Sequence, residues 1–291
     1  MTKSINHITQ TVMSLVKVVF LSKWFGALRY TTQNRSVIIL GNGPSFSVSV
    51  RKYHEQLMKH DLVCVNSFAN TEYYSQLQPR FYVLQAPILF DTDAKSSDFY
   101  INYRNELYTN IAEQTSWELQ IVVPFRAKKS PEFRQLLARN NNIKPVYFND
   151  TAIEGFEWFT SLLFRLKLGM PRPHNVLIPT IMTSIGMGFK NIYLIGADHS
   201  WLSEISVNDQ NEALVNQKHF YDENASQPEK MQDYINRPRR LHEIIDKFYL
   251  TFRGYWEIKA FAEQKKVTII NCSETSMIDA FDRQALDEIT D

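Results

Sequence analysis

A buried strand near the start of the chain runs directly into small polar residues that could bind a nucleotide. Residues 37–40 are all apolar, and the turn that follows is Gly41, Asn42, Gly43, Pro44 and Ser45. Ligands of open α/β sheets bind at the carboxyl ends of such strands. The glycines can adopt positive φ and leave room for a ligand, and the serine can cap a following helix. We call residues 41–45 the first turn and predict that it binds a nucleotide, although Gly-rich turns without a ligand have the same composition.

Two other predicted strands end in polar residues that could reach the same ligand. A second apolar run stops at Asn66 and Ser67, and a later one stops at Gly196 and Asp198. The carboxyl ends of parallel strands meet at one edge of a sheet, so these groups could bind a base, a ribose or a phosphate together with the first turn. Each of them taken alone is more often an ordinary turn residue.

Three further polar residues are candidate contacts to a substrate. Gln85 ends a third predicted strand, and His199 and Ser200 directly follow Asp198. Asp198 and His199 are also residue types that bind metals. Around them, however, the chain has no HxH, HExxH or DxD pattern and no cysteine. We therefore predict no metal site there, and we expect Asp198 to orient its loop.

One histidine lies in a segment that we predict to be a lid. Residues 203–240 have high charge and little periodicity, which is typical of a long mobile loop. His219 lies within this loop and is followed by Phe220 and Tyr221. Histidine side chains titrate near neutral pH, so His219 could act as a general base when the lid closes, and Tyr221 could exclude water or bind a phosphate. A solvated loop histidine without a catalytic role is the alternative.

The order of apolar runs and helical patterns predicts the fold class. Strand-like runs alternate with helical patterns, as in an α/β protein with right-handed crossovers. We therefore predict a Rossmann-like, mostly parallel sheet with helices on both faces, and we assign residues 36–291 to this one nucleotide-binding domain. The predicted strands are residues 37–40, 61–67, 81–87, 119–124, 146–148, 191–195 and 267–273, and the helices are residues 50–60, 152–169, 178–187 and 249–264.

Residues 1–35 predict a separate amphipathic helix. Residues 4–29 place apolar side chains on one broad face at helical spacing, and Lys17, Lys23 and Arg29 interrupt them. No acidic residue occurs before Glu55. A basic amphipathic helix of this kind is typical of a segment that lies on an anionic membrane surface without crossing it. A helix that packs on the protein's own core, or on a second subunit of a homo-oligomer, fits the pattern equally well.

The composition excludes several classes of protein. With 44% hydrophobic and 22% charged residues the chain is an ordinary folded protein, and a net charge of +1 argues against a nucleic-acid-binding surface. Its two cysteines, Cys64 and Cys272, each stand beside a predicted strand and fit buried free thiols in a reducing compartment. The amino terminus has no secretory signal pattern, so we expect a cytoplasmic protein.

Four of these features occur together in an order that resembles a known family. The first turn, the strand that ends at Asn66, the run from Gly188 to Asp198 and the isolated His219 are similar to those of the bacterial lipooligosaccharide sialyltransferases. The same order also resembles the proteins that are similar to archaeal 6-hydroxymethylpterin pyrophosphokinase. The resemblance spans about residues 36–275 and is specific only at these four points.

The first resemblance implies a glycosyltransferase of bacterial surface-glycan synthesis. Its donor would be CMP-activated sialic acid or another ulosonic acid, used without a metal or other cofactor. Its acceptor would be a glycan or lipid-linked glycan at the inner face of the cytoplasmic membrane. The family's nucleotide-binding asparagines correspond to Asn42 and Asn66, and its base corresponds to His219, which would take a proton from the acceptor during inverting transfer.

Other functions stay open at this point. The second resemblance implies an Mg²⁺-dependent pyrophosphokinase that acts on a pterin-like alcohol, and a non-catalytic nucleotide-binding module is a third reading. The chain also departs from the sialyltransferases. They have a tyrosine soon after the Gly-x-Asp strand, where this chain has His199, Ser200 and Trp201, and they have an asparagine before the proline that follows Gln85 and Ala86 here. The predicted fold does not depend on these positions, whereas the donor and the reaction do.

Overall fold

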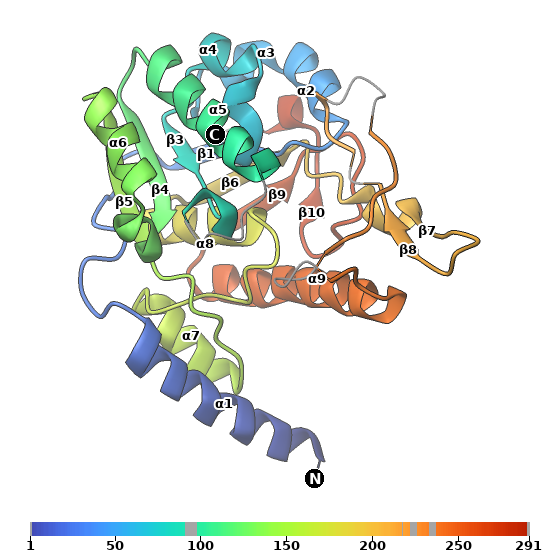
Figure 1. Ribbon diagram of the computed structural model, residues 1–291. Coiled ribbons are helices and arrows are strands. Elements are labelled where there is room, and N and C mark those ends of the chain that lie inside the picture. Colours follow the sequence, from blue (N-terminus) through green and yellow to red (C-terminus); the bar gives the residue numbers. More distant parts are fainter. Residues whose placement is uncertain (1, 91–97, 217, 222–225, 233–236, 290–291) are drawn as a thin grey trace.

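A parallel sheet forms the centre of the molecule (Figure 1). The computed structural model describes residues 2–90, 98–216, 218–221, 226–232 and 237–289. Within these residues the sheet has eight strands in the order β10, β9, β6, β1, β2, β3, β4, β5, and every neighbouring pair is parallel. The strands are β1 (Ser36–Leu40), β2 (Asp61–Val65), β3 (Phe81–Val83), β4 (Leu119–Pro124), β5 (Ile143–Phe148), β6 (Asn191–Ile195), β9 (Thr268–Asn271) and β10 (Asp282–Arg283). The predicted Rossmann-like α/β class is therefore confirmed.

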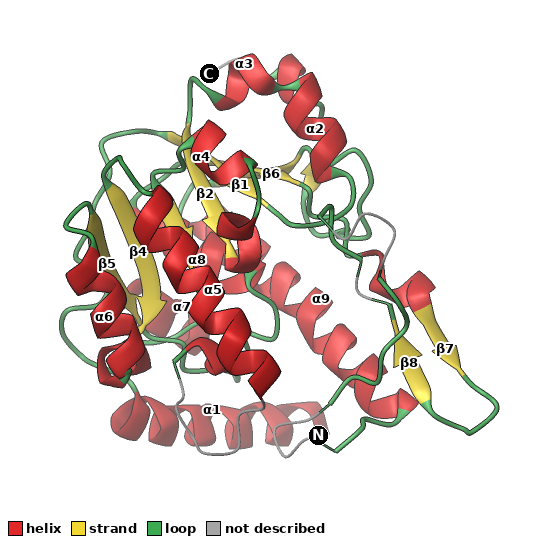
Figure 2. Ribbon diagram, turned by 45° about the horizontal axis from the view of Figure 1, so that its top comes forward, coloured by secondary structure: helices red, strands yellow, loops and turns green. Residues whose placement is uncertain are grey.

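Helices cover both faces of this sheet (Figures 1 and 2). One face carries α2 (Phe46–Lys52), α3 (His54–Leu57), α4 (Tyr73–Leu77), α5 (Asp98–Gln114) and α6 (Pro131–Arg139). The other face carries α7 (Glu157–Arg165), α8 (Leu177–Met187) and α9 (Leu241–Gln264). Along β1, Val37 and Ile39 belong to the second layer, whereas Ile38 and Leu40 belong to the first. This is why the strand reads as a continuous apolar run.

The strand order reverses at β1. From β1 the chain builds β2, β3, β4 and β5 toward one edge, and it then returns to place β6 on the other side of β1. The carboxyl ends of β1 and β6 therefore lie side by side, with Leu40 opposite Ile195. In open α/β sheets this reversal leaves a crevice at the carboxyl edge, where ligands bind.

Several elements differ in extent from the predicted ones. The helix predicted over residues 152–169 is restricted to α7, because Ala152 forms a β-bridge with Met170 and Ile153 N donates to Met170 O. The last helix, α9, begins at Leu241, eight residues before its predicted start. The short strand β10 follows β9 and was not predicted, because Asp282 and Arg283 are exposed and carry no apolar pattern.

The segment predicted to be an unstructured lid contains a hairpin. Strands β7 (Ile205–Val207) and β8 (Ala213–Val215) pair in antiparallel fashion. Val215 and Ala213 pack with Ile244 and Phe248 of α9 in a small apolar cluster of their own. The expectation of little regular structure is therefore wrong for residues 205–215, while residues 217, 222–225 and 233–236 of the predicted lid lie outside the described residues.

The predicted amino-terminal helix is α1 (Thr2–Leu21), and one of its faces packs on the protein. Val18 is fully buried in the core, and Ser22 Oγ donates to Leu168 O at 2.6 Å. None of the helices in the described part of the chain combines the length and the apolar character needed to traverse a bilayer. Cys64 and Cys272 are buried free thiols, as the sequence predicts.

Candidate active site

Two turns at the carboxyl ends of β1 and β6 interlock through their backbones. Gly41 N donates to Ile195 O and Gly43 N donates to Gly196 O, both at 2.8 Å. We call residues 196–200 the second turn. These bonds extend the pairing of β1 with β6 past the end of both strands. The first and second turns therefore form one continuous wall at the point where the strand order reverses.

The glycines of these turns are required by the approach of one backbone to the other. A Cβ on Gly41 would lie 2.4 Å from Gly196 O, and a Cβ on Gly43 would lie 2.0 Å from Asp198 Oδ2. Neither Gly41 nor Gly43 has positive φ, whereas Gly196 has φ of 63°. The first-turn glycines therefore do not use the positive φ that glycine allows, and the space that was expected to admit a ligand beside them is filled by the second turn.

The Asp198 carboxylate fixes the first turn. Its Oδ2 accepts from Ser45 Oγ at 2.8 Å, its Oδ1 accepts from Ser45 N at 3.1 Å, and Oδ1 also accepts from Thr275 Oγ1 at 2.7 Å. Ser45 therefore does not cap α2 with its side chain, as had been expected, because its hydroxyl is used by Asp198. Through these contacts Asp198 links the first turn to Thr275, which follows β9 in the chain.

Asn42 and Asn66 line one cavity at this edge. Asn42 Nδ2 donates to Val65 O at 3.1 Å, which ties the first turn to the end of β2. The Oδ1 atoms of Asn42 and Asn66 are buried without a hydrogen-bond partner in the described part of the chain. Asn66 also has the uncommon φ of 46°. Buried amide oxygens normally have partners, so these two are suited to accept hydrogen bonds from a bound ligand.

The segment that carries His219 is attached to the first turn. Phe220 N donates to Asn42 O at 3.1 Å, and the Phe220 ring packs on Phe46 at a centroid distance of 4.5 Å. The His219 ring stacks on Tyr221 at 5.0 Å with an angle of 5° between the planes. His219 and Lys218 thereby line the same cavity as Asn42.

The cavity has a volume of about 210 Å³ and lies between the two turns and the start of α8. Its walls come from the first turn, the end of β2, the start of α8, the second turn and the segment of His219. The lining residues are Gly41, Asn42, Gly43, Pro44, Val65, Asn66, His174, Asn175, Val176, Leu177, Gly196, Asp198, His199, Ser200, Trp201, Lys218 and His219. Larger hollows of about 450 and 380 Å³ exist elsewhere, but neither is lined by the residues at this edge.

Two histidines of the cavity are held in the neutral form. Burial lowers the pKa of His199 to about 3, and its Nε2 lies 2.5 Å from the Tyr255 hydroxyl. Burial and the cations Arg172, Lys247 and Arg239 lower the pKa of His174 to about 4. At neutral pH both rings therefore act as hydrogen-bonding groups without charge.

The start of α8 adds dipole and amide groups to the same wall. Asn175 Oδ1 accepts from Leu177 N at 2.7 Å and from the Tyr255 hydroxyl at 3.4 Å. The amino end of a helix carries partial positive charge and favours a bound anion. His174 Nε2, next to it in the chain, is buried without a hydrogen-bond partner in the described part of the chain.

Four predicted site residues lie outside the lining of the cavity. Ser45 is occupied by Asp198, and the Ser67 hydroxyl lies 2.7 Å from that of Tyr103. Gln85 is buried at the end of β3, where its carbonyl oxygen accepts from Arg126 Nη2 at 2.6 Å. Tyr221 contacts the site through its stacking on His219. The other predicted residues, namely Gly41, Asn42, Gly43, Pro44, Asn66, Gly196, Asp198, His199, Ser200 and His219, lie together on the cavity wall.

The described residues contain no group of three or more histidine, cysteine or acidic side chains that could hold a metal ion. Around Asp198 the carboxylate is already bonded to Ser45 and Thr275. The sequence has one Asp-Thr-Asp spacing, at Asp91 and Asp93, and it lies outside the described residues.

Sequence reasoning did not include His174, Asn175 and Tyr255 in the site. The residues between the prolines at 171 and 173 and the predicted helix at 178 carry no strand-like or helical pattern. An Asn directly before an apolar helix is a known start signal, and it could have marked Asn175. Tyr255 lies in the middle of α9, where its spacing predicts only a core residue, so the sequence held no signal for its contact with His199.

Comparisons with known proteins identify the fold and leave the family open. No family model matches the sequence, and no curated protein matches it. Among solved structures, the chain is similar to the MAf glycosyltransferase from Magnetospirillum magneticum AMB-1, with a TM-score of 0.52 and 12% sequence identity. The match covers 98% of this chain and 39% of the other, so this chain spans about two fifths of that protein's length. At this identity the likeness shows a shared fold.

Proposed function

We propose that this protein is a glycosyltransferase that moves a sialic-acid-like or other ulosonic acid from a CMP donor to a hydroxyl of a glycan. The observation that carries the proposal is the position of His219. Phe220 N is bonded to Asn42 O, so a histidine far along the chain shares one cavity with both turns at the reversal of strand order. The fold shared with a glycosyltransferase supports the same class of reaction.

The proposed nucleotide contacts follow from the polar groups of the cavity. The Oδ1 atoms of Asn42 and Asn66 are placed to accept hydrogen bonds from a cytosine amino group or from ribose hydroxyls. The amino end of α8, with Lys218 and the Ser200 hydroxyl on the same wall, would face the phosphate. His199 and Ser200 stand where the resembling family has a phosphate-binding tyrosine, and we assign the departing phosphate to them.

In the proposed reaction His219 removes the proton from the acceptor hydroxyl. The acceptor oxygen forms a bond to the anomeric carbon while the bond from that carbon to the phosphate oxygen breaks, so configuration inverts and CMP leaves as an anion. The proton ends on the His219 ring. Tyr221 keeps that ring in position by stacking, and no metal takes part in this scheme.

Thermal unfolding with nucleotides tests the donor. The native protein would be incubated with CMP, CDP, UDP, GDP or ATP, each with and without Mg²⁺. Among these nucleotides we expect only CMP to stabilise the native protein without Mg²⁺. At a CMP concentration of a hundred times Kd the stabilisation should be about 2.7 kcal/mol. Stabilisation by ATP only with Mg²⁺ would instead favour the pyrophosphokinase, and a lack of response to every nucleotide would overturn both.

Substitution of His219 tests the chemistry. CMP release from CMP-N-acetylneuraminic acid, with lactose as acceptor, would be compared in His219→Ala and in His54→Ala, which replaces an exposed histidine on α3. We expect His219→Ala to keep the CMP-induced stabilisation and to lose about 10²-fold or more in rate, while His54→Ala keeps both. An unchanged rate in His219→Ala would refute the assigned base. If CMP binds but neither the wild type nor the variants release CMP from the donor, the protein is a nucleotide-binding module.

A further inference from the structure

Helix α1 exposes a continuous apolar stripe. The stripe residues recur at spacings of three and four and therefore share one face of the helix. They are Ile5, Ile8, Val12, Leu15, Val16, Val19 and Phe20, and each is at least 46% exposed. Phe20 reaches 80%, and Phe25, just beyond the helix, reaches 87%. Contiguous exposed apolar surface of this kind marks a site of interaction with another molecule or a membrane.

The opposite face of α1 is fixed to the body of the protein. Ser14 Oγ donates to Glu154 O at 2.8 Å and accepts from Glu154 N at 2.9 Å. Thr11 Oγ1 accepts a hydrogen bond from Phe156 N at 3.1 Å. Thr11 also packs against Gly155 so closely that a Cβ on Gly155 would lie 2.2 Å from Thr11 Oγ1. The stripe residues are therefore held on the exposed side of the helix. Figure 1 shows α1 at the periphery of the molecule, beside α7.

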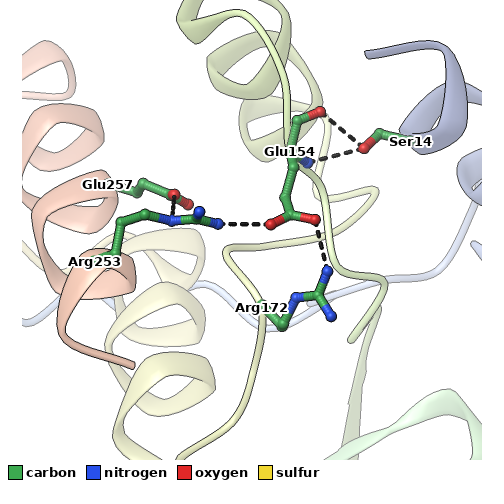
Figure 3. Close-up of polar contacts among 5 residues, drawn as sticks. All are labelled: Ser14, Glu154, Arg172, Arg253 and Glu257. Atoms are coloured by element: carbon green, nitrogen blue, oxygen red, sulfur yellow. Dashed lines mark hydrogen bonds and ion pairs between the residues drawn. The ribbon is translucent and has the colours of Figure 1, made fainter. Parts of the chain in front are cut away.

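The same glutamate connects α1 with the candidate active site. Glu154 accepts from Arg172 Nη2 at 2.7 Å and from Arg253 Nη2 at 2.6 Å, and Arg253 Nε pairs with Glu257 at 3.0 Å (Figure 3). Arg172 lies two residues before His174, which lines the cavity. A surface bound to the stripe would thus be held in a set orientation relative to the cavity.

The charged side chains of the amino-terminal segment itself have one sign. Lys17, Lys23 and Arg29 lie along the same segment, and no acidic residue occurs before Glu55. Beside α1, α7 adds exposed apolar side chains at Trp158 and Leu162. An apolar helix face flanked by basic residues, with aromatic side chains at its end, matches the chemistry of an anionic lipid surface. Pairing with the α1 of a second copy would instead bring like charges together, with no acidic residue on either helix to offset them.

We propose that α1 lies in the headgroup region of an anionic lipid bilayer, with its stripe toward the acyl chains and its basic residues among the phosphates. This orientation brings the cavity of the candidate active site to a fixed place near the membrane, where a lipid-linked acceptor would be reached. The docking itself does not depend on the proposed reaction, and its test needs no substrate.

Co-sedimentation with vesicles tests the proposal. The full chain would be mixed with vesicles of equal parts phosphatidylglycerol and phosphatidylcholine, or of phosphatidylcholine alone. We expect partition into the anionic vesicles, weakened by salt, and a loss of more than about tenfold in the double variant Val12→Asp/Val16→Asp. The matched control is Met58→Asp, which alters a residue that is 56% exposed and far from α1 in the sequence. Its partition should equal that of the wild type.

A second variant separates lipid charge from folding defects. Lys17→Gln/Lys23→Gln keeps the stripe and should lose the preference for anionic over neutral vesicles. Light scattering of the wild type without lipid would be measured in parallel. Wild type that stays in the supernatant with anionic vesicles would overturn the proposal. A dimer that Phe20→Ser converts to a monomer would also overturn it and would assign the stripe to a second copy.

Discussion

The Ser45 hydroxyl donates a hydrogen bond of 2.8 Å to Asp198 Oδ2, although 153 residues separate the two in the chain. Through this contact the turn after β6 sets the position of the turn after β1. The crevice between them is therefore a property of both turns together, and each of them depends on the other for its shape.

Loss of the Asp198 charge should destabilise the protein. Asp198→Asn replaces one acceptor oxygen with a donor that faces the Ser45 or Thr275 groups, so we expect the free energy of unfolding to fall by about 2–3 kcal/mol. Urea denaturation would measure this change. Asp209→Asn, at an exposed position in the β7–β8 hairpin, is the control and should alter stability by less than about 0.5 kcal/mol. Equal effects of the two variants would contradict the role assigned to Asp198.

A methyl group on the first turn should push the two turns apart. In Gly43→Ala the new Cβ would meet Asp198 Oδ2 at 2.0 Å and Gly196 O at 2.6 Å, and the backbone atom cannot easily move. We expect a loss of roughly 1–3 kcal/mol in the free energy of unfolding, together with weaker nucleotide binding. In Gly254→Ala on α9 the new Cβ would meet the flexible end of Ile178 at 3.1 Å and Pro171 Cβ at an ordinary contact distance of 3.8 Å. Alanine also favours a helix, so the stability of this variant should change little. Thermal unfolding of both variants would measure this difference in stability.

His199 should make stability depend on pH. Burial lowers its pKa to about 3 in the folded state, whereas an unfolded histidine titrates near 6.5. Below pH 6.5 the unfolded chain binds a proton that the folded chain excludes, so stability falls as the pH falls toward 3, by at most about 1.4 kcal/mol per pH unit from this group. His199→Phe should therefore lose less stability than the wild type between pH 7 and pH 5. Denaturation curves at several pH values test this, and parallel slopes in both proteins would refute it.

The Tyr255 hydroxyl should matter through His199. It is the hydrogen-bond partner of His199 Nε2 and also bonds Asn175, so Tyr255→Phe would leave the buried His199 and the half-buried Asn175 with one contact fewer each. We expect a loss of about 1–3 kcal/mol in the free energy of unfolding. Tyr100→Phe, at a residue that is 39% exposed, is the matched control and should be nearly neutral. A neutral Tyr255→Phe would show that His199 has no need of this partner.

Glu154 should stabilise the junction of α1, α9 and the loop before α8. Burial alone would raise the pKa of Glu154, but hydrogen bonds from Arg172 and Arg253 outweigh it and lower that pKa. Its contribution is therefore present above the ordinary carboxyl range and is lost as the pH falls through the folded-state pKa. Glu154→Gln should cost about 1–3 kcal/mol at pH 7 and much less near pH 3. Glu113→Gln, which breaks an exposed pair with Arg139, should cost less than about 1 kcal/mol.

The local sequence was sufficient to predict those elements whose structure depends mainly on their own residues. The apolar runs of β1, β2 and β6 predicted buried parallel strands, because each of them faces helices on both sides. The polar residues at their ends predicted the edge at which the cavity lies. The sequence also singled out His219, which lines the cavity, since a histidine in a charged loop fits neither a core strand nor a helix face.

Only the tertiary structure determined which of these segments contact one another and form the candidate active site. Gly41 and Gly43 are required by the backbone of Gly196 and the carboxylate of Asp198, a contact between segments more than 150 residues apart that no local pattern encodes. His174 lines the cavity only because the loop before α8 reaches the second turn, and Tyr255 of α9 contacts the site through His199. Likewise, the sequence shows that α1 is amphipathic and basic. Only the packing determined that the face with Ser14 and Val18 is buried and that the face with the apolar stripe stays exposed. Local residue types set strand and helix, whereas contacts between distant segments set the site.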